Sequence, residues 1–265
     1  MFEKWMKVKV FITVMTYPHP SLAYDELVCT AGITEKGEWI RLYPVNFRYR
    51  PNEQQYSKYQ WIEVELPVYA HNRDVRKESH RPNLDSLRII SPVIDTKDGW
   101  SERAKIVEQM NINTIRELEK LYKVDKTSLG IVKPTKVIDV TVEPDKREWK
   151  AQWRLVQDSV RLFGGKPKMI KKLPYKFRYK FECSDSTRPH ELMIEDWELG
   201  VLFFKELERL GDEKSAIDSV RHKYLNDLCS YKRDTYFYVG TRFPYNKWIV
   251  LGVYYPPKER QTPLF

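Results

Sequence analysis

Basic and aromatic side chains are interleaved in one stretch of the sequence, between Arg161 and Phe181. Eight lysines or arginines occur there without an acidic residue, and five aromatic residues lie among them. Lysine and arginine neutralise phosphates and release counterions, and flat aromatic faces are stacking platforms for unpaired bases. The stretch therefore indicates nucleic-acid binding, although a charged run is as often the solvated face of an ordinary strand.

We predict DNA or RNA binding, with recognition of a single-stranded or modified base. Arg41 and Tyr43 share one face of a predicted strand, because side chains alternate along it. Phosphate contacts are predicted for Arg41, Arg48, Arg154, Lys171, Lys172, Lys176 and Arg178, and base stacking for Tyr43, Tyr175 or Tyr179.

The alternative is a metal-dependent nuclease or another phosphate-processing enzyme. Carboxylates that converge can hold Mg²⁺, which bridges the scissile phosphate. Asp74, Glu78 and His80 follow one another in an arginine-rich loop, and Asp196 and Glu198 begin a predicted helix. An equal alternative for the loop is a solvated segment whose charges neutralise each other. For Asp196 and Glu198 the alternative is that the helix dipole favours acidic residues at a helix start. Catalytic residues stay unassigned, with these five as candidates.

No cofactor and no resident metal are predicted. The sequence contains no Walker A motif, no G-x-G-x-x-G, no H-E-x-x-H and no G-x-S-x-G. Its three cysteines form no C-x-x-C pair, and Cys183 with His190 makes only half of a zinc site. Three cysteines cannot all pair, which fits a reducing compartment.

Composition limits the class of protein. The chain has 265 residues, 42% of them hydrophobic, and a formal net charge of +9. This apolar content packs a core. No run approaches the roughly 20 apolar residues of a membrane-spanning helix, and the first residues lack the pattern of a signal peptide. We expect a cytoplasmic protein without membrane association, whose basic surface meets nucleic acid or an acidic protein partner.

Strands in the first half must position most of these side chains. Runs rich in β-branched and aromatic residues predict strands at 8–15, 26–33, 38–43, 61–67 and 87–94. Apolar residues at helical spacing predict one helix at 101–122, before a short strand at 136–142. We expect an α+β protein with a β-rich, barrel-like core and packed helices, divided into a β-rich domain at 1–145 and an α+β part at 146–265.

The second half is predicted to mix helices and strands. A helix opens after Pro144, where Asp145 and Glu148 have the spacing of a capping box, and ends at Gly164. Tyr175–Phe181 alternates as a strand with aromatic residues inward and cations outward. Two further helices and a closing hairpin are expected at 194–210, 212–229, 235–239 and 248–254.

Several motifs resemble those of a widespread set of uncharacterised prokaryotic and phage proteins. They are T-Y-P-H-P-S at 16–21, V-C-T-A-G-I at 28–33, W-I-R-L-Y-P-V-N-F-R at 39–48 and I-E-D-W-E-L-G at 194–200. That resemblance implies no activity. In that set a second cysteine follows the position of Cys183, and this chain lacks it. In fold, strand-borne aromatics beside a basic cleft look like PUA-like modules, including ASCH and EVE domains, which implies RNA or modified-base recognition.

Overall fold

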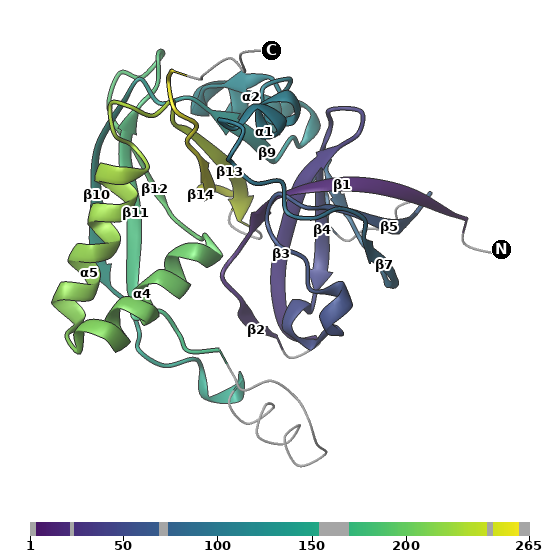
Figure 1. Ribbon diagram of the computed structural model, residues 1–265, viewed down its shortest axis with the longest axis horizontal. Coiled ribbons are helices and arrows are strands. Elements are labelled where there is room, and N and C mark those ends of the chain that lie inside the picture. The colour runs from purple at the N-terminus through teal and green to yellow at the C-terminus, as the bar shows by residue number, and fades with distance from the viewer. Residues whose placement is uncertain (1–3, 22–23, 69–73, 154–169, 243–245, 260–265) are drawn as a thin grey trace.

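The computed structural model describes residues 4–21, 24–68, 74–153, 170–242 and 246–259. Within them the chain is a strand-rich α+β protein built from three sheets, which confirms the predicted class (Figure 1). None of the described helices is both long and apolar enough to cross a membrane.

The largest sheet has seven strands, all from the first 89 residues. Its order is β6-β4-β3-β1-β5-β7, with β2 paired to β3. The strands are β1 (Trp5–Met15), β2 (His19–Ser21), β3 (Asp25–Thr34), β4 (Trp39–Val45), β5 (Trp61–Pro67), β6 (Ser79–His80) and β7 (Asn83–Ile89). Four predicted strands are confirmed, and the fifth lies earlier than predicted. The ladder ends before Pro92, which has no N–H to donate to it.

The helix predicted at 101–122 is two helices, α1 (Ser101–Val107) and α2 (Ile115–Asp125). The short strand β8 (Ile112–Asn113) separates them. Thr114 Oγ1 accepts the Glu117 N–H at 3.2 Å, and the Glu117 carboxylate accepts the Thr114 N–H at 2.7 Å. This capping box starts a new helix at the residue where the single predicted helix would have continued, so that prediction is wrong.

A four-stranded sheet lies at the centre of the molecule (Figure 1). It contains β8, β9 (Leu129–Val132), β13 (Tyr236–Arg242) and β14 (Lys247–Tyr254). Tyr236 and Tyr238 pack with the seven-stranded sheet, while Phe237 and Val239 pack with the opposite cluster. Both faces of this sheet are therefore buried, and the predicted closing hairpin is confirmed.

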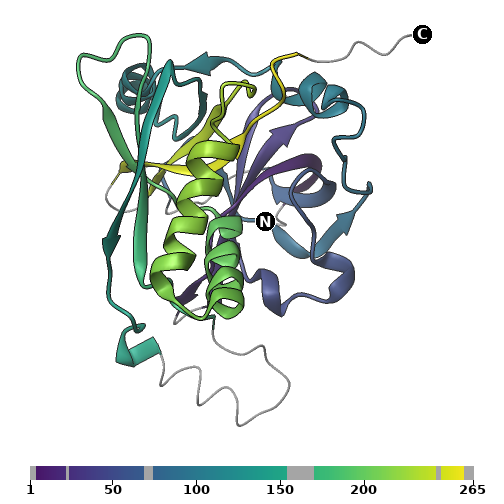
Figure 2. The same ribbon diagram turned by 60° about the vertical axis from the view of Figure 1, so that its left-hand side comes forward.

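The third sheet consists of β10 (Lys136–Pro144), β11 (Tyr175–Glu182) and β12 (His190–Met193). Phe177, Tyr179 and Phe181 are buried while Lys180 is exposed, as the alternation predicts. Helices α4 (Trp197–Leu210) and α5 (Glu213–Arg221), followed by a π-helical turn at His222–Asp227, lie beside it (Figure 2, green). Their apolar sides share one core with β11 and β13.

The helix predicted to open after Pro144 is wrong at its start. Asp145 pairs with Lys172 at 2.6 Å, and residues 145–150 are not helical. Most of the remainder of that helix, and residues 161–169 of the basic stretch, lie outside the described residues.

Candidate functional site

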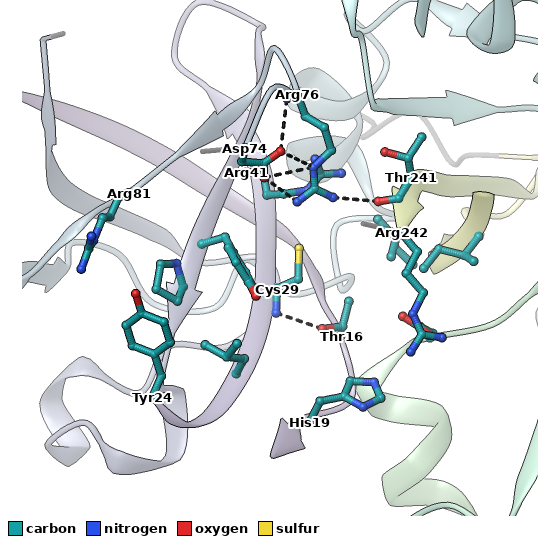
Figure 3. A pocket seen from close by; sticks show the side chains of 16 residues that line it. Thr16, His19, Tyr24, Cys29, Arg41, Asp74, Arg76, Arg81, Thr241 and Arg242 are labelled. Atoms are coloured by element: carbon teal, nitrogen blue, oxygen red, sulfur yellow. Dashed lines mark hydrogen bonds and ion pairs between the residues drawn. The ribbon is translucent and has the colours of Figure 1, made fainter. Parts of the chain in front are cut away.

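A pocket of about 710 Å³ lies between the seven-stranded and four-stranded sheets (Figure 3). Strands β2, β3 and β4 and the loop before β6 form one wall, and β13, β14 and Glu195 form the other. Its described lining is Thr16, His19, Tyr24, Leu27, Cys29, Arg41, Tyr43, Pro44, Asp74, Arg76, Arg81, Glu195, Thr241, Arg242, Ile249 and Leu251. The volume falls in the range of about 300–1,000 Å³ that is usual for small-molecule sites.

Arg41 is the most buried charged side chain of the pocket, with 1% of its surface exposed. Strand alternation places Arg41 and Tyr43 in the pocket wall, while Ile40 and Leu42 pack into the core behind it. The prediction that Arg41 and Tyr43 share one face is confirmed.

Two serines and a glutamate hold the Arg41 guanidinium. Its Nη1 donates to the hydroxyls of Ser128 at 2.6 Å and Ser79 at 3.4 Å, and Nη2 donates to the Ser128 carbonyl at 3.1 Å. The Ser128 hydroxyl and N–H in turn donate to the Glu78 carboxylate at 2.7 and 2.9 Å. Burial lowers the pKa of Arg41, but arginine stays protonated in proteins. Its Nε has no acceptor among the described residues.

Arg76 and Asp74 form a forked ion pair in the same wall. Nε and Nη2 of Arg76 donate to the two carboxylate oxygens at 2.8 and 2.6 Å. Nη1 of Arg76 donates to the Thr241 carbonyl at 2.9 Å, which ties this loop to β13. Burial raises the pKa of Asp74, but the hydrogen bonds and charge of Arg76 outweigh it and hold that pKa below its usual value.

Aromatic and basic side chains occupy the more open part of the pocket. Tyr24 and Tyr43 are 38% and 37% exposed, and Arg81 is exposed. Figure 3 shows Tyr24 and Arg81 on the same side of the pocket. Arg242 pairs with Glu195 at 2.6 Å. Four arginines against two carboxylates give the described lining an excess of two positive charges, which favours an anionic ligand.

The basic stretch reaches the pocket at His19. Burial lowers the pKa of His19, which favours its neutral form. Its ring packs edge-on against Trp149 at 5.5 Å, and the Trp149 indole donates to the Ile170 carbonyl at 2.8 Å. Nζ of Lys172 lies 5.7 Å from the Trp149 ring. Residues 170–172 therefore lie beside one edge of the pocket wall.

Of the ten residues predicted to contact nucleic acid, Arg41 and Tyr43 line the pocket. Five others have acidic partners: Arg48 with Glu26, Lys172 with Asp145, Lys176 and Arg178 with Glu143, and Tyr175 with Glu213. Lys171 is exposed, and Arg154 lies outside the described residues. Much of the basic charge on β11 is therefore balanced by β10 and its neighbours.

The prediction that Tyr179 stacks on a base is wrong. Its side chain has no exposed surface, its hydroxyl donates to the Tyr224 carbonyl at 2.8 Å, and its ring stacks on Phe237 at 4.4 Å. A tyrosine enclosed in this way contributes to the core, and the inward face of the alternating strand accounts for it.

The candidates for metal-dependent chemistry are dispersed. Only Asp74 lines the pocket, and Glu78 is engaged by Ser128. Asp196 caps α4 by accepting the Glu198 N–H at 3.2 Å, and Lys58 pairs with both carboxylates at 2.6 and 3.2 Å. No group of three potential metal ligands occurs in the part of the chain that the structure describes. His80 is also absent from the pocket lining, so the nuclease alternative stays a prediction that these placements do not support.

Several lining residues were not singled out by the sequence. Tyr24 immediately precedes β3 and Arg242 comes from the distant strand β13, whereas His19 of β2 belongs to the T-Y-P-H-P-S motif without a predicted role. The arginine-rich loop that the sequence indicated supplies Arg76 and Arg81. No local pattern in the sequence indicates Tyr24 or Arg242, because only the packing of two sheets brings them together.

Residues 110–265 match the model of a family described as Domain of unknown function (DUF8757). The chain belongs to this family. Residues 6–109 match a second model, described as Domain of unknown function (DUF8758). No curated protein matches the chain.

Both matched segments contribute to the pocket. The DUF8758 segment supplies Arg41, Tyr43 and Asp74, and the DUF8757 segment supplies Glu195 and Thr241. The matches meet between residues 109 and 110, whereas the domain division at residue 145 stays a prediction. Strand β10 ends at that predicted division and pairs with β11 beyond it. The pocket is thus a joint product of the two segments.

Proposed function

We propose that this protein binds nucleic acid by taking one unpaired nucleotide, standard or modified, into the pocket. The observation that carries the proposal is the combination of side chains there: exposed Tyr24, Tyr43 and Arg81 at the open part, and buried Arg41 in the wall. Aromatic faces stack on exposed bases, and arginines contact phosphate. The excess positive charge of the lining adds a general attraction for a polyanion.

The neighbouring basic residues give a bound strand a path away from the pocket. Lys171 is exposed next to Ile170, whose carbonyl accepts the Trp149 indole N–H beside His19. Phosphates on either side of the inserted nucleotide would meet such side chains without base readout. The sequence-predicted basic stretch then adds to affinity, while the pocket selects the nucleotide.

The proposal extends to the fold of the protein and to its location in the cell. We infer that the seven-stranded sheet is the barrel-like, PUA-like core that the resemblance implies, and that the chain groups with the prokaryotic and phage proteins sharing its motifs. In support, V-C-T-A-G-I and W-I-R-L-Y-P-V-N-F-R supply β3 and β4, which both line the pocket. Three free cysteines support a reducing, cytoplasmic location.

Binding of labelled single-stranded and duplex DNA and RNA across a salt series tests the function. Tyr43→Ala should weaken binding about 5- to 150-fold, the effect of losing one stacked base. Arg81→Ala should weaken binding and flatten its salt dependence. Tyr231→Ala and Arg88→Ala are matched controls, because Tyr231 is 80% exposed, Arg88 is exposed on β7, and neither lines the pocket.

Equal losses in the pocket and control variants would refute the role of the pocket. Absence of binding to every nucleic acid would refute the function and favour an acidic protein partner for the basic surface. Cleavage that requires added Mg²⁺ would favour the nuclease alternative instead.

A further inference from the structure

The wall of the pocket holds a positive charge without a direct counter-ion. No carboxylate among the described residues forms an ion pair with Arg41 within 4.0 Å. Asp74 is committed to Arg76, and the Glu78 carboxylate reaches the Arg41 guanidinium only through Ser128. A buried cation is unfavourable unless an anion compensates it, so an anion in the pocket would supply what this wall lacks.

Two buried polar atoms of the lining residues also lack partners in the described structure: Nε of Arg41 and Oγ1 of Thr241. Buried polar atoms in folded proteins are nearly always hydrogen-bonded. Strand β4 carries the first atom and β13 carries the second, so the two lie in opposite walls. Both atoms are buried beneath the pocket surface, so the acceptor oxygens of a ligand would reach them only after the side chains around them move.

The free edge of the Arg41 guanidinium has the form that binds oxyanions. Ser128 takes Nη1 and Nη2 together, which leaves the side formed by Nε and the second proton of Nη2. Elsewhere in this protein the same edge grips a carboxylate, in Arg48 with Glu26 and in Arg76 with Asp74. Forked contacts of this kind suit carboxylate and phosphate.

We propose that the pocket binds a phosphomonoester, the terminal phosphate of a nucleic-acid strand, through Arg41 and Thr241; this rests on the proposed function. A phosphate inside the strand carries a sugar on both sides and about one negative charge. A terminal phosphate has the chain on one side only and carries about two negative charges. That charge matches the excess of two positive charges in the described lining.

Binding of one oligonucleotide with hydroxyl ends, a 5′-phosphate or a 3′-phosphate tests the inference. One of the phosphorylated forms should bind at least about 10-fold more tightly than the hydroxyl form, the scale of a charge-assisted hydrogen bond. Arg41→Lys keeps the charge but loses the fork, and should remove this preference. A nucleoside monophosphate and inorganic phosphate serve as competitors.

Thr241→Val gives a second variant that loses no hydrogen bond of the described structure at its hydroxyl, so it should fold. It should reduce the preference for the phosphorylated end several-fold. Thr13→Val is its matched control, because the Thr13 hydroxyl is likewise buried and without a partner in the described chain but does not line the pocket.

The outcomes separate the two proposals. Equal affinity for all three ends would refute the phosphate site and leave nucleic-acid binding intact. Binding of the nucleoside monophosphate without any oligonucleotide would refute nucleic-acid binding and retain the phosphomonoester site. Failure of every ligand to bind would overturn both. A preference that Thr13→Val and Thr241→Val reduce equally would refute the assignment to Thr241.

Discussion

Replacing Gly200 by alanine is predicted to destabilise the protein, although alanine is the better helix former. Gly200 lies in α4, and a Cβ built there would come within 2.2 Å of two ring carbons of Tyr17. That ring is 8% exposed, and its hydroxyl donates to the Lys171 carbonyl at 2.8 Å. To restore an ordinary contact of 3.4 Å the ring would have to move by about 1.2 Å.

The expected loss is about 3 kcal/mol in the free energy of unfolding. Overpacking of a core typically costs about 1–3 kcal/mol, and here it falls at the upper end, because the contact is far below any observed separation. Displacing the ring also weakens a hydrogen bond worth about 1 kcal/mol. The higher helix propensity of alanine offsets this loss by about 1 kcal/mol.

A double-mutant cycle in urea denaturation tests this reasoning. In a Tyr17→Ala background the clash is absent, so Gly200→Ala should stabilise the protein by up to about 1 kcal/mol. The same substitution thus changes sign between the two backgrounds. An equal effect in both, or a gain of stability in the wild-type background, would refute the packing argument.

Three further predictions concern the pocket and the core. Glu78→Gln should lower the free energy of unfolding by about 2 kcal/mol, because the buried carboxylate accepts charge-assisted bonds; an unchanged urea midpoint would contradict this. Tyr179→Phe should cost about 1–2 kcal/mol and leave affinity for nucleic acid unchanged, since its hydroxyl bonds inside the core; a change of affinity alone would contradict the buried position. The folded-state pKa of Asp74 is depressed, so its contribution to stability is present above about pH 4 and is lost as the pH falls below that. Below about pH 4 the melting temperature of Asp74→Asn should fall less steeply with pH than that of the wild type. The same pH dependence in both proteins would refute the contribution of Asp74.

Alternation along the strands made much of the β structure predictable. Arg41 and Tyr43 were correctly assigned to one face, and the inward aromatics of β11 follow the same rule. The central sheet has two buried faces, so β13 and β14 are continuous apolar runs, which still identify strands but not the partners of each face. Long-range pairing is decided by packing between sheets.

The errors have local causes. Apolar spacing continued through the break between α1 and α2, and the deciding signal was the Thr114 cap. Asp145 has the sequence spacing of a helix cap, but its carboxylate pairs with Lys172, which lies far along the chain. The basic stretch is evident in the sequence, but its pairing with acidic residues of β10 is not, because that pairing depends on the register between β10 and β11. Most of the pocket was invisible for the same reason.

The central sheet has a consequence for the order of synthesis. Its strands β13 and β14 are made after residue 235, yet they cover the apolar face that Phe11 and Ile33 present from the first sheet. During translation that face stays uncovered until β13 and β14 are made, so the nascent chain exposes apolar surface of the kind that promotes aggregation. Thr241, Arg242, Ile249 and Leu251 arrive with the same hairpin, so the pocket is completed only with the last strands.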